Sequence, residues 1–452
     1  MKHFVGASMA TIVSLALAAA ALSGPAAIAE SEDFAVLPPV AKDDGPAQDP
    51  AQVAARLTPL TQDAKKLGKK SATRVVDSGD GSTLFDDEGS VPVIPASTNK
   101  IPTSVAALKY VGSDTTLKTR VTRAGNDVTL IGGGDPLLVS KVAKKEPGYP
   151  VYPQPTSLRR LATDTAKALK AAGGTNVALK VDDSLFDGPA WNPAWSPDFR
   201  TQGIVAPVSA LIVNDGRVGA SEWAPIGPDP ALAAGDVFAQ LLRAQGIKVT
   251  GVQRGKSGDG AQELAVVESA PIYQLVAQAL TTSDNQTAEN LFRLAGREAG
   301  FGGSFAGGGQ AVTKALDGLG LATTLLRFDD GSGLSRENQL TANLLTDILR
   351  RAVRGEDGLW PISSGLAVAG VQGTLRGRFQ TPETSVGAGW VRGKTGTLNY
   401  VSSLAGFMQS RSGRVLVFAS IANEATSSFD AATQIDKIVA AAADCGCPGA
   451  GR

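Results

Sequence analysis

Histidine is almost absent from the sequence, and this absence excludes whole classes of chemistry. The chain has one histidine, His3. Residues 1–29 carry an early lysine, then an uncharged run rich in alanine, leucine and valine, and end at Ala27-Ile28-Ala29. This order is typical of a secretory signal peptide. We therefore expect an exported mature chain without histidine. Such a chain cannot form a Ser-His-Asp triad or a histidine-containing metal site, and we expect neither metal nor cofactor.

Cysteine and long apolar runs are also scarce. The two cysteines, Cys445 and Cys447, lie near the C-terminus. In an oxidising compartment they would form a strained local disulfide, link two chains, or carry no chemistry at all. No cysteine follows Ala29, so we do not expect a lipid anchor there. No later stretch reaches the length that a membrane span needs, so we expect no stable transmembrane anchor after signal cleavage.

Net charge is absent as well. The 43 lysines and arginines balance 43 aspartates and glutamates, which argues against nucleic acid as a partner. The chain of 452 residues is long enough for two or three domains, and its 52 glycines predict many turns. These numbers leave the oligomeric state open.

The hydrophobic pattern predicts a mixture of helices and strands. Helices are predicted at residues 50–66 with a bend near Pro59, 157–172, 236–245, 269–280, around 288–294, and at 310–319, 341–353 and 429–443. Strands are predicted at 74–77, 83–85, near 121, and at 128–130, 177–181, 206–214, 248–250, 401–408 and 415–421. Residues 30–48 are polar and acidic, as in a flexible lead-in. The character of the sequence changes after Gly112.

One short stretch combines a hydroxyl with an amine. Ser97 and Lys100 stand three residues apart, and the apolar residues that follow recur at helical spacing. A helix that starts near Ser97 would bring both side chains to one face. The pair is then a candidate nucleophile and base at a helix N-terminus. By itself Ser-x-x-Lys is a weak signal. Pro102 is unusual here, because it lacks an N–H and would kink the helix or force a tight first turn.

Two later motifs strengthen this interpretation. Ser283 and Asn285 fall on a predicted loop between helices, where capping alone would also explain them. Lys394 is followed by Thr395 and Gly396 on or beside a predicted strand, where an edge-strand lysine would be unremarkable. The three motifs together, in this order and without histidine, form the Ser-x-x-Lys, Ser-x-Asn and Lys-Thr-Gly signature of penicillin-binding proteins and class A β-lactamases.

Beyond the motifs, nearly all of the mature chain resembles the low-molecular-mass penicillin-binding proteins of the PBP4 type, which are D-alanyl-D-alanine carboxypeptidase/endopeptidases. Ser97 and Ser283 are 186 residues apart, far more than in compact β-lactamases, and the PBP4-like family fills this gap with inserted domains. The stretches that carry the resemblance are Pro95–Lys100, Gly132–Pro136, Val208–Leu211, Asp330–Arg336, Gly373–Arg376 and Gly393–Thr397.

The resemblance implies an α/β (α+β) transpeptidase fold of the penicillin-binding-protein and β-lactamase type. It consists of an antiparallel sheet flanked by helices, a helical subdomain, and inserted smaller β-rich domains. The catalytic domain would be discontinuous, with residues 49–112 and 266–452, and residues 113–265 would form the insert.

The residues themselves suggest how such a site works. Without histidine, Lys100 is the available base for Ser97, provided that its pKa falls from about 10.4 toward neutrality. Burial and a nearby cation such as Lys394 both lower a lysine pKa. Ser97 would attack the carbonyl of the penultimate D-alanine. Ser283 would relay a proton to the leaving amine, and Asn285 would hold the substrate amide.

The remaining contacts concern the two ends of the substrate. Lys394 in the Lys-Thr-Gly396 motif, with the hydroxyls of Thr395 and Thr397, would bind the terminal carboxylate. By resemblance, the N–H groups of Ser97 and Thr397 would form the oxyanion hole. Relatives also use an aspartate from the insert and an arginine after the Gly-Ser-Gly-Leu-Ser loop to reach the side-chain end of the third peptide residue. The nearest matches are Asp198 and Arg336.

These residues together predict a serine-type D-Ala-D-Ala carboxypeptidase/DD-endopeptidase, exported to the periplasm or cell wall. Its partners would be peptidoglycan stem peptides and, as substrate mimics, β-lactam antibiotics. Two alternatives remain. A β-lactamase would share the nucleophile but would hydrolyse its acyl-enzyme quickly, and the long insert argues against this alternative. A non-catalytic wall-binding scaffold would not need the intact motifs.

Overall fold

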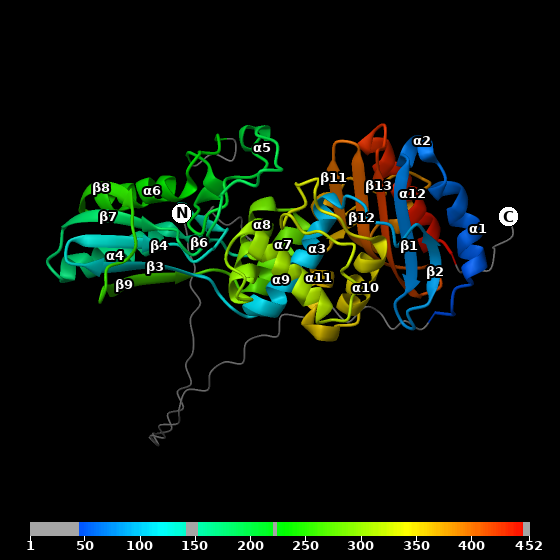
Figure 1. Cartoon of the computed structure of the whole chain (residues 1–452), viewed down its shortest axis with the longest axis horizontal. Coiled ribbons are helices and arrows are strands. Elements are labelled where there is room, and N and C mark those ends of the chain that lie inside the picture. Colours follow the sequence, from blue (N-terminus) through cyan, green and yellow to red (C-terminus); the bar gives the residue numbers. More distant parts are fainter. Residues whose placement is uncertain (1–44, 142–151, 220–223, 446–452) are drawn as a thin grey trace, which may run out of the picture. The chain divides into compact units, whose positions relative to one another are not determined.

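The computed structural model describes residues 45–141, 152–219 and 224–445, all of which lie within one compact unit. The predicted signal peptide, most of the predicted lead-in and Cys447 fall outside these ranges. The helical layer and two sheets that position the candidate site are visible in Figure 1.

A six-stranded antiparallel sheet forms one part of the fold, in the order β10-β11-β12-β13-β1-β2. β12 and β13 are buried along almost their whole length, because helices cover both faces. Successive residues of β13 therefore enter different cores: Phe418 packs with α1 and α12, whereas Val417 packs with the helical layer. The strands are β1 (Lys70–Asp77), β2 (Thr83–Asp87), β10 (Ala367–Val368), β11 (Val391–Leu398), β12 (Val401–Gln409) and β13 (Val415–Asn423).

The helical layer surrounds the segment that follows Ser97. All seven residues of α3 are buried, and α8 and α9 pack against it. Side-chain caps fix the starts of the neighbouring helices: Asp284 accepts from the Thr287 N–H, and Thr341 accepts from the Leu344 N–H. The helices are α3 (Lys100–Ala106), α7 (Ile272–Thr281), α8 (Asn285–Glu298), α9 (Phe305–Asp317), α10 (Ala342–Val353) and α11 (Trp360–Ser364), with α1 (Pro50–Thr61), α2 (Ala64–Leu67) and α12 (Ser428–Ala443) on the other sheet face.

A second sheet of five strands lies wholly between residues 118 and 268, in the order β8-β7-β4-β3-β9. β7 pairs in parallel with β4 and β8, and the other pairs are antiparallel. Helices α4 and α6 fill one core with it. The elements are β3 (Lys118–Ala124), β4 (Asp127–Ile131), β7 (Asn176–Asp182), β8 (Lys248–Arg254), β9 (Gln262–Glu268), α4 (Leu158–Ala171) and α6 (Pro230–Ala244), with the short β5 (Leu138–Val139), β6 (Thr156–Ser157) and α5 (Asp198–Thr201).

The predicted fold is confirmed: an antiparallel sheet with helices and an inserted sheet. Most predicted elements exist, but two helices start earlier than the periodicity indicated. α6 begins at Pro230 instead of residue 236, because Asp229 caps it and proline suits a first turn. α9 begins at Phe305 instead of residue 310, because the glycines of its first turns weaken the helical pattern.

The predicted strand at residues 206–214 is wrong. The structure has an irregular segment there that ends in a 3₁₀ turn at Asn214–Gly216. Its apolar side chains are buried, which explains the strand-like pattern. Its backbone is partly satisfied by side chains instead of by a neighbouring strand, as when the N–H of Ala206 donates to Gln286 of α8. In the part of the chain that the structure describes, no helix has the length and hydropathy to cross a membrane.

Candidate active site

Ser97 and Lys100 lie at the junction of two kinds of helix. Residues Ala96–Asn99 form a 3₁₀ turn, and α3 begins at Lys100. The Lys100 Nζ lies 3.0 Å from the Ser97 Oγ. Pro102 falls in the first turn of α3, where a backbone N–H has no partner within the helix. Of the two effects expected of Pro102, a kink or a tight first turn, the structure has a tight 3₁₀ turn directly before α3, and the helix continues past the proline to Ala106.

The backbone beside Ser97 is held in a strained conformation. Ala96 has a φ of 48°, in the left-handed region that costs an ordinary residue energy. Gly333 packs directly beneath it, and a Cβ on Gly333 would lie 1.9 Å from the Ala96 carbonyl oxygen. Only glycine therefore fits at this point of the 330–336 loop, which fixes the position of the nucleophile's neighbour.

The Lys100 amine meets three acceptors. Besides the Ser97 Oγ, it lies 2.8 Å from the Asn285 Oδ1 and 2.8 Å from the Ser332 carbonyl oxygen. Lys100 is fully buried, and this burial lowers its pKa to about 8, although nearby carboxylates, first Glu289, act in the opposite direction. An amine whose pKa lies near neutral pH, and which contacts fixed acceptors and a hydroxyl, is suited to exchange a proton with that hydroxyl.

Ser283 and Lys394 form a second hydroxyl–amine pair. Ser283 sits between α7 and α8 with a φ of 63°, and its Oγ accepts from the Lys394 Nζ at 2.9 Å. Lys394 also donates to the Thr395 carbonyl oxygen at 2.8 Å. Its pKa lies well below the ordinary value, because it is buried and because Lys100 carries like charge nearby. One loop thus joins the two lysines: Ser283 contacts one amine, and Asn285 contacts the other.

β11 passes directly against the backbone of the nucleophile. A Cβ on Gly396 would lie 2.9 Å from the Ser97 nitrogen and 2.8 Å from the Pro95 carbonyl oxygen. β10 pairs with β11 only at Arg392 and Gly393, so from Lys394 onward this edge carries no further strand of the described chain. An uncovered strand edge beside a nucleophile is able to pair with an extended peptide.

The two threonines of β11 have different surroundings. The Thr395 hydroxyl donates to the Thr374 hydroxyl at 2.8 Å, and the Thr397 side chain is exposed. Thr374 belongs to the Gly373–Arg376 stretch, one of those that carry the family resemblance and for which no role was predicted.

The segment between β7 and α6 also reaches the site. The Asn285 Nδ2 donates to the Ile204 carbonyl oxygen at 3.0 Å, and this bond orients the amide so that its oxygen faces Lys100. The Trp195 indole donates to the Asp330 carboxylate at 2.8 Å. Both contacts come from residues predicted to belong to the insert.

Sequence reasoning missed two buried carboxylates under the site. Asp330 accepts from the N–H groups of Gly333 and Ser335, at 2.7 and 2.6 Å, and Glu289 accepts from the N–H groups of the Gly331-Ser332 segment. Burial raises the pKa of both carboxyls. The signal that could have revealed Glu289 is its place on the buried, apolar side of α8, directly after Ala288.

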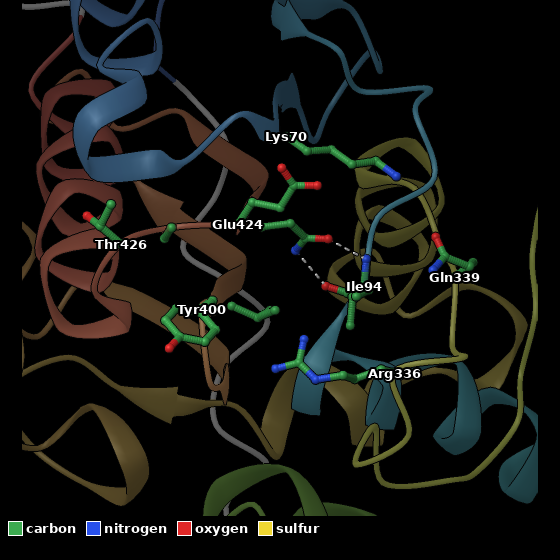
Figure 2. A pocket seen from close by; sticks show the side chains of 10 residues that line it. Lys70, Ile94, Arg336, Gln339, Tyr400, Glu424 and Thr426 are labelled. Atoms are coloured by element: carbon green, nitrogen blue, oxygen red, sulfur yellow. Dashed lines mark hydrogen bonds between the residues drawn. The ribbon is translucent and has the colours of Figure 1, made fainter. Parts of the chain in front are cut away.

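Arg336 and Asp198 do not contact the Ser97 and Lys100 pair. The Arg336 guanidinium donates to the Asn399 carbonyl oxygen after β11. It lines a pocket of about 470 Å³, in which Tyr400 lies across from it and Ile94 is held by hydrogen bonds to Asn423 (Figure 2). Asp198 is exposed at the start of α5, and within the described ranges its carboxylate makes no hydrogen bond or ion pair with the other predicted site residues.

Known proteins resemble this chain over most of its length. The model of the D-Ala-D-Ala carboxypeptidase 3 (S13) family matches residues 53–225 and 226–445. Carboxypeptidase Rv3627c of Mycobacterium tuberculosis is 37% identical over 383 residues, which cover 83% of this chain and 80% of that protein. A D-alanyl-D-alanine carboxypeptidase of Actinomadura sp. strain R39 is 28% identical over a gapped alignment of 468 positions, which covers 82% of each chain.

A solved structure with the same fold is penicillin binding protein 4 of Haemophilus influenzae. It superimposes with a TM-score of 0.71 at 22% identity, covering 85% of this chain and 98% of that one. A second structure of that protein, with a TM-score of 0.66, contains a bound β-lactam.

The two buried lysines allow a direct titration test. With lysines carrying ¹³C at Cε, NMR should show a Lys100 signal that titrates near pH 8 instead of the ordinary 10.5. Lys100→Met should remove that signal and raise the pKa of Lys394, because Lys100 supplies part of the repulsion that lowers it. Lys70→Met, at a partly exposed lysine, should change neither. A Lys100 signal that titrates above pH 10 would show that burial does not lower the pKa of this lysine.

Proposed function

Because the chain belongs to the D-Ala-D-Ala carboxypeptidase 3 (S13) family, we propose that it cleaves the terminal D-Ala–D-Ala bond of peptidoglycan stem peptides through an acyl-enzyme on Ser97. The class of enzyme follows from the family: a serine-type D-Ala-D-Ala carboxypeptidase of the PBP4 type that acts on peptidoglycan. The proposal concerns which residues of this chain carry out the reaction.

The contact set of Lys100 supports its role as the base most strongly. A neutral amine has two hydrogens and one lone pair. The Asn285 Oδ1 and the Ser332 carbonyl oxygen can each accept a hydrogen but cannot donate one to the amine. They therefore take both hydrogens and leave the lone pair for the Ser97 hydroxyl at 3.0 Å. This geometry sets Lys100 to accept the proton as Ser97 attacks.

The proposed reaction has two chemical steps. The Ser97 oxygen bonds to the carbonyl carbon of the penultimate D-alanine while its proton passes to Lys100. The N–H groups of Ser97 and Thr397 stabilise the oxyanion, where one such donor is typically worth roughly 3–4 kcal/mol. The C–N bond then breaks, and Ser283 relays to the leaving D-alanine amine the proton that Lys100 took from Ser97. Water hydrolyses the ester and restores Ser97.

Substrate binding is assigned to residues beside the Ser97 and Lys100 pair. Lys394, with the hydroxyls of Thr395 and Thr397, would bind the terminal carboxylate, and Asn285 would hold the substrate amide. Gly396, which has no side chain, would let the edge of β11 lie close to the backbone of Ser97. A carboxylate on Lys394 favours its charged form, and that charge in turn favours the neutral form of Lys100. Substrate binding and activation of the nucleophile are coupled in this way.

Asp198 and Arg336 are proposed to bind the side-chain end of the third peptide residue. The loop after α5 supports Asp198, since Ile204 on that loop contacts Asn285. Arg336 follows Ser332 by four residues and lines the pocket of Figure 2.

β-Lactams, as mimics of the D-Ala-D-Ala end, would acylate the same Ser97. Endopeptidase action on cross-links is part of the proposal, as is export by the segment 1–29, since peptidoglycan lies outside the cytoplasmic membrane.

The first test uses a fluorescent penicillin and a stem pentapeptide. The wild-type protein should keep the label and release D-alanine, and Ser97→Ala should abolish both, because in the described structure Ser97 is the only hydroxyl hydrogen-bonded to the Lys100 amine. Ser385→Ala, at an exposed serine, is the matched control and should behave as wild type. An unlabelled wild type would rule out the catalytic role. Rapid loss of the label with hydrolysed drug would favour a β-lactamase.

A second test separates Arg336 from the chemistry. Arg336→Ala should lower kcat/KM for a stem pentapeptide about 10-fold or more, as expected for loss of a hydrogen bond to a charged group. Its acylation by penicillin, which lacks that side chain, should stay within about 2-fold of wild type. The matched control is Arg327→Ala, an exposed arginine on the same loop. Equal losses for peptide and penicillin would show that Arg336 acts on the nucleophile instead.

A further inference from the structure

Glu289 is a buried carboxylate without a part in the reaction just described. It lies on α8, six residues after Ser283, and its side chain has no exposed surface. A buried charge is costly unless it is paired or hydrogen-bonded. Its contacts therefore need an explanation.

Both oxygens of Glu289 bind one turn of the 330–336 loop. The Oε1 accepts from the Ser332 N–H at 2.7 Å, and the Oε2 accepts from the Gly331 N–H at 3.1 Å. The carbonyl of the same Ser332 accepts from the Lys100 Nζ at 2.8 Å. A single residue thus has its N–H on Glu289 and its C=O on the catalytic amine.

The loop has little freedom to sit elsewhere. A Cβ on Gly331 would lie 2.5 Å from the Phe292 Cβ, so this glycine packs directly onto α8. On the far side, Gly333 packs against Ala96, next to the nucleophile. A shift of the Gly331-Ser332 segment would therefore move an acceptor of Lys100 and the support of Ser97 together.

Charge also links Glu289 to Lys100. Its negative charge is the largest of the influences that hold the Lys100 pKa up against burial. The other charged groups around this centre are Asp330 on the loop, Asp284 at the cap of α8, Lys394 on β11, and Arg293 one turn further along α8. Burial, and then Asp330, raise the pKa of the Glu289 carboxyl, so it can itself take up a proton as the pH falls.

We propose that Glu289 is a positioning residue that holds the Ser332 carbonyl on Lys100, and that its charge sets the pH range in which Lys100 can act as a base. This inference rests on the proposed function. A purely structural Glu289 would stabilise the loop but would leave the pH dependence of acylation in place.

The test follows the rate of Ser97 acylation by a fluorescent penicillin between pH 5 and 10. In wild type the rate should rise with pH as Lys100 loses its proton. Where Glu289 is ionised, its charge favours protonated Lys100. Glu289→Gln removes that charge, so the rise should move to lower pH by about one unit, as is typical for the loss of a nearby opposite charge. Glutamine can accept only one of the two N–H bonds, so the plateau rate should fall by roughly 10²-fold, the cost of a small misplacement in a catalytic group.

Two further variants separate charge from position. Glu289→Asp keeps the charge but is too short for both N–H groups, so it should keep the wild-type pH rise with a reduced plateau. Glu298→Gln, at an exposed glutamate on the last turn of α8, should match wild type in both.

The outcomes are distinct. A Glu289→Gln protein that reacts more slowly with an unmoved pH rise would overturn the proposed control by charge. If that variant does not fold, a Glu289→Asp plateau equal to wild type would overturn the proposed positioning role. An unlabelled wild type, or a labelled Ser97→Ala, would instead be a failure of the proposed function, and the two failures are therefore distinguishable.

Discussion

The structure depends on one buried amine. Lys100 lies at the start of α3, without exposed surface, and its hydrogen bonds join the nucleophile, the Ser-x-Asn loop and the 330–336 loop. A lysine in water would be charged at neutral pH and useless as a base. Burial makes the neutral form accessible, but a buried amine needs an acceptor for each of its hydrogens. The arrangement of the helical layer around α3 meets that need.

Close backbone packing holds this arrangement together. Gly396 brings β11 against Ser97 from the sheet side, and Gly333 brings the loop against Ala96 from the helical side. Two non-glycine residues, Ala96 and Ser283, have positive φ values next to the chemistry. Strained residues persist where their surroundings fix them. In this protein Ala96 precedes Ser97, which carries one hydroxyl of the site, and Ser283 carries the other. The carboxylates of Glu289 and Asp330 satisfy the N–H groups of the loop between these points.

The fold class was predicted from the motifs and the family resemblance, whereas amphipathic spacing, a local property, predicted most of the longer helices and strands. It did not predict β9, a strand of the inserted sheet, or the short elements β5, β6, β10, α5 and α11. The sequence also selected the motif residues that the structure brings together, since Ser-x-x-Lys, Ser-x-Asn and Lys-Thr-Gly are short and stand in order. It failed at residues 206–214, where an apolar run is buried without strand pairing, because the satisfaction of its backbone by Gln286 is a long-range contact. Glu289 was missed for the same reason, since its partners lie about 42 residues away along the chain. The roles of all the predicted site residues stay predictions, and Asp198 and Arg336 differ from the others in that they do not contact the Ser97 and Lys100 pair.

The central claim is that Lys100 removes the proton from Ser97. The most direct measurement is the rate of acylation of Lys100→Arg by a penicillin at pH 8, in a variant whose folding is verified by its melting temperature. Arginine keeps the positive charge but cannot be deprotonated in a protein. If Lys100 is the base, the rate for Lys100→Arg should fall by roughly 10³-fold or more, within the range that a general base contributes. A rate within about 10-fold of wild type would contradict this claim, because a fixed charge would then suffice.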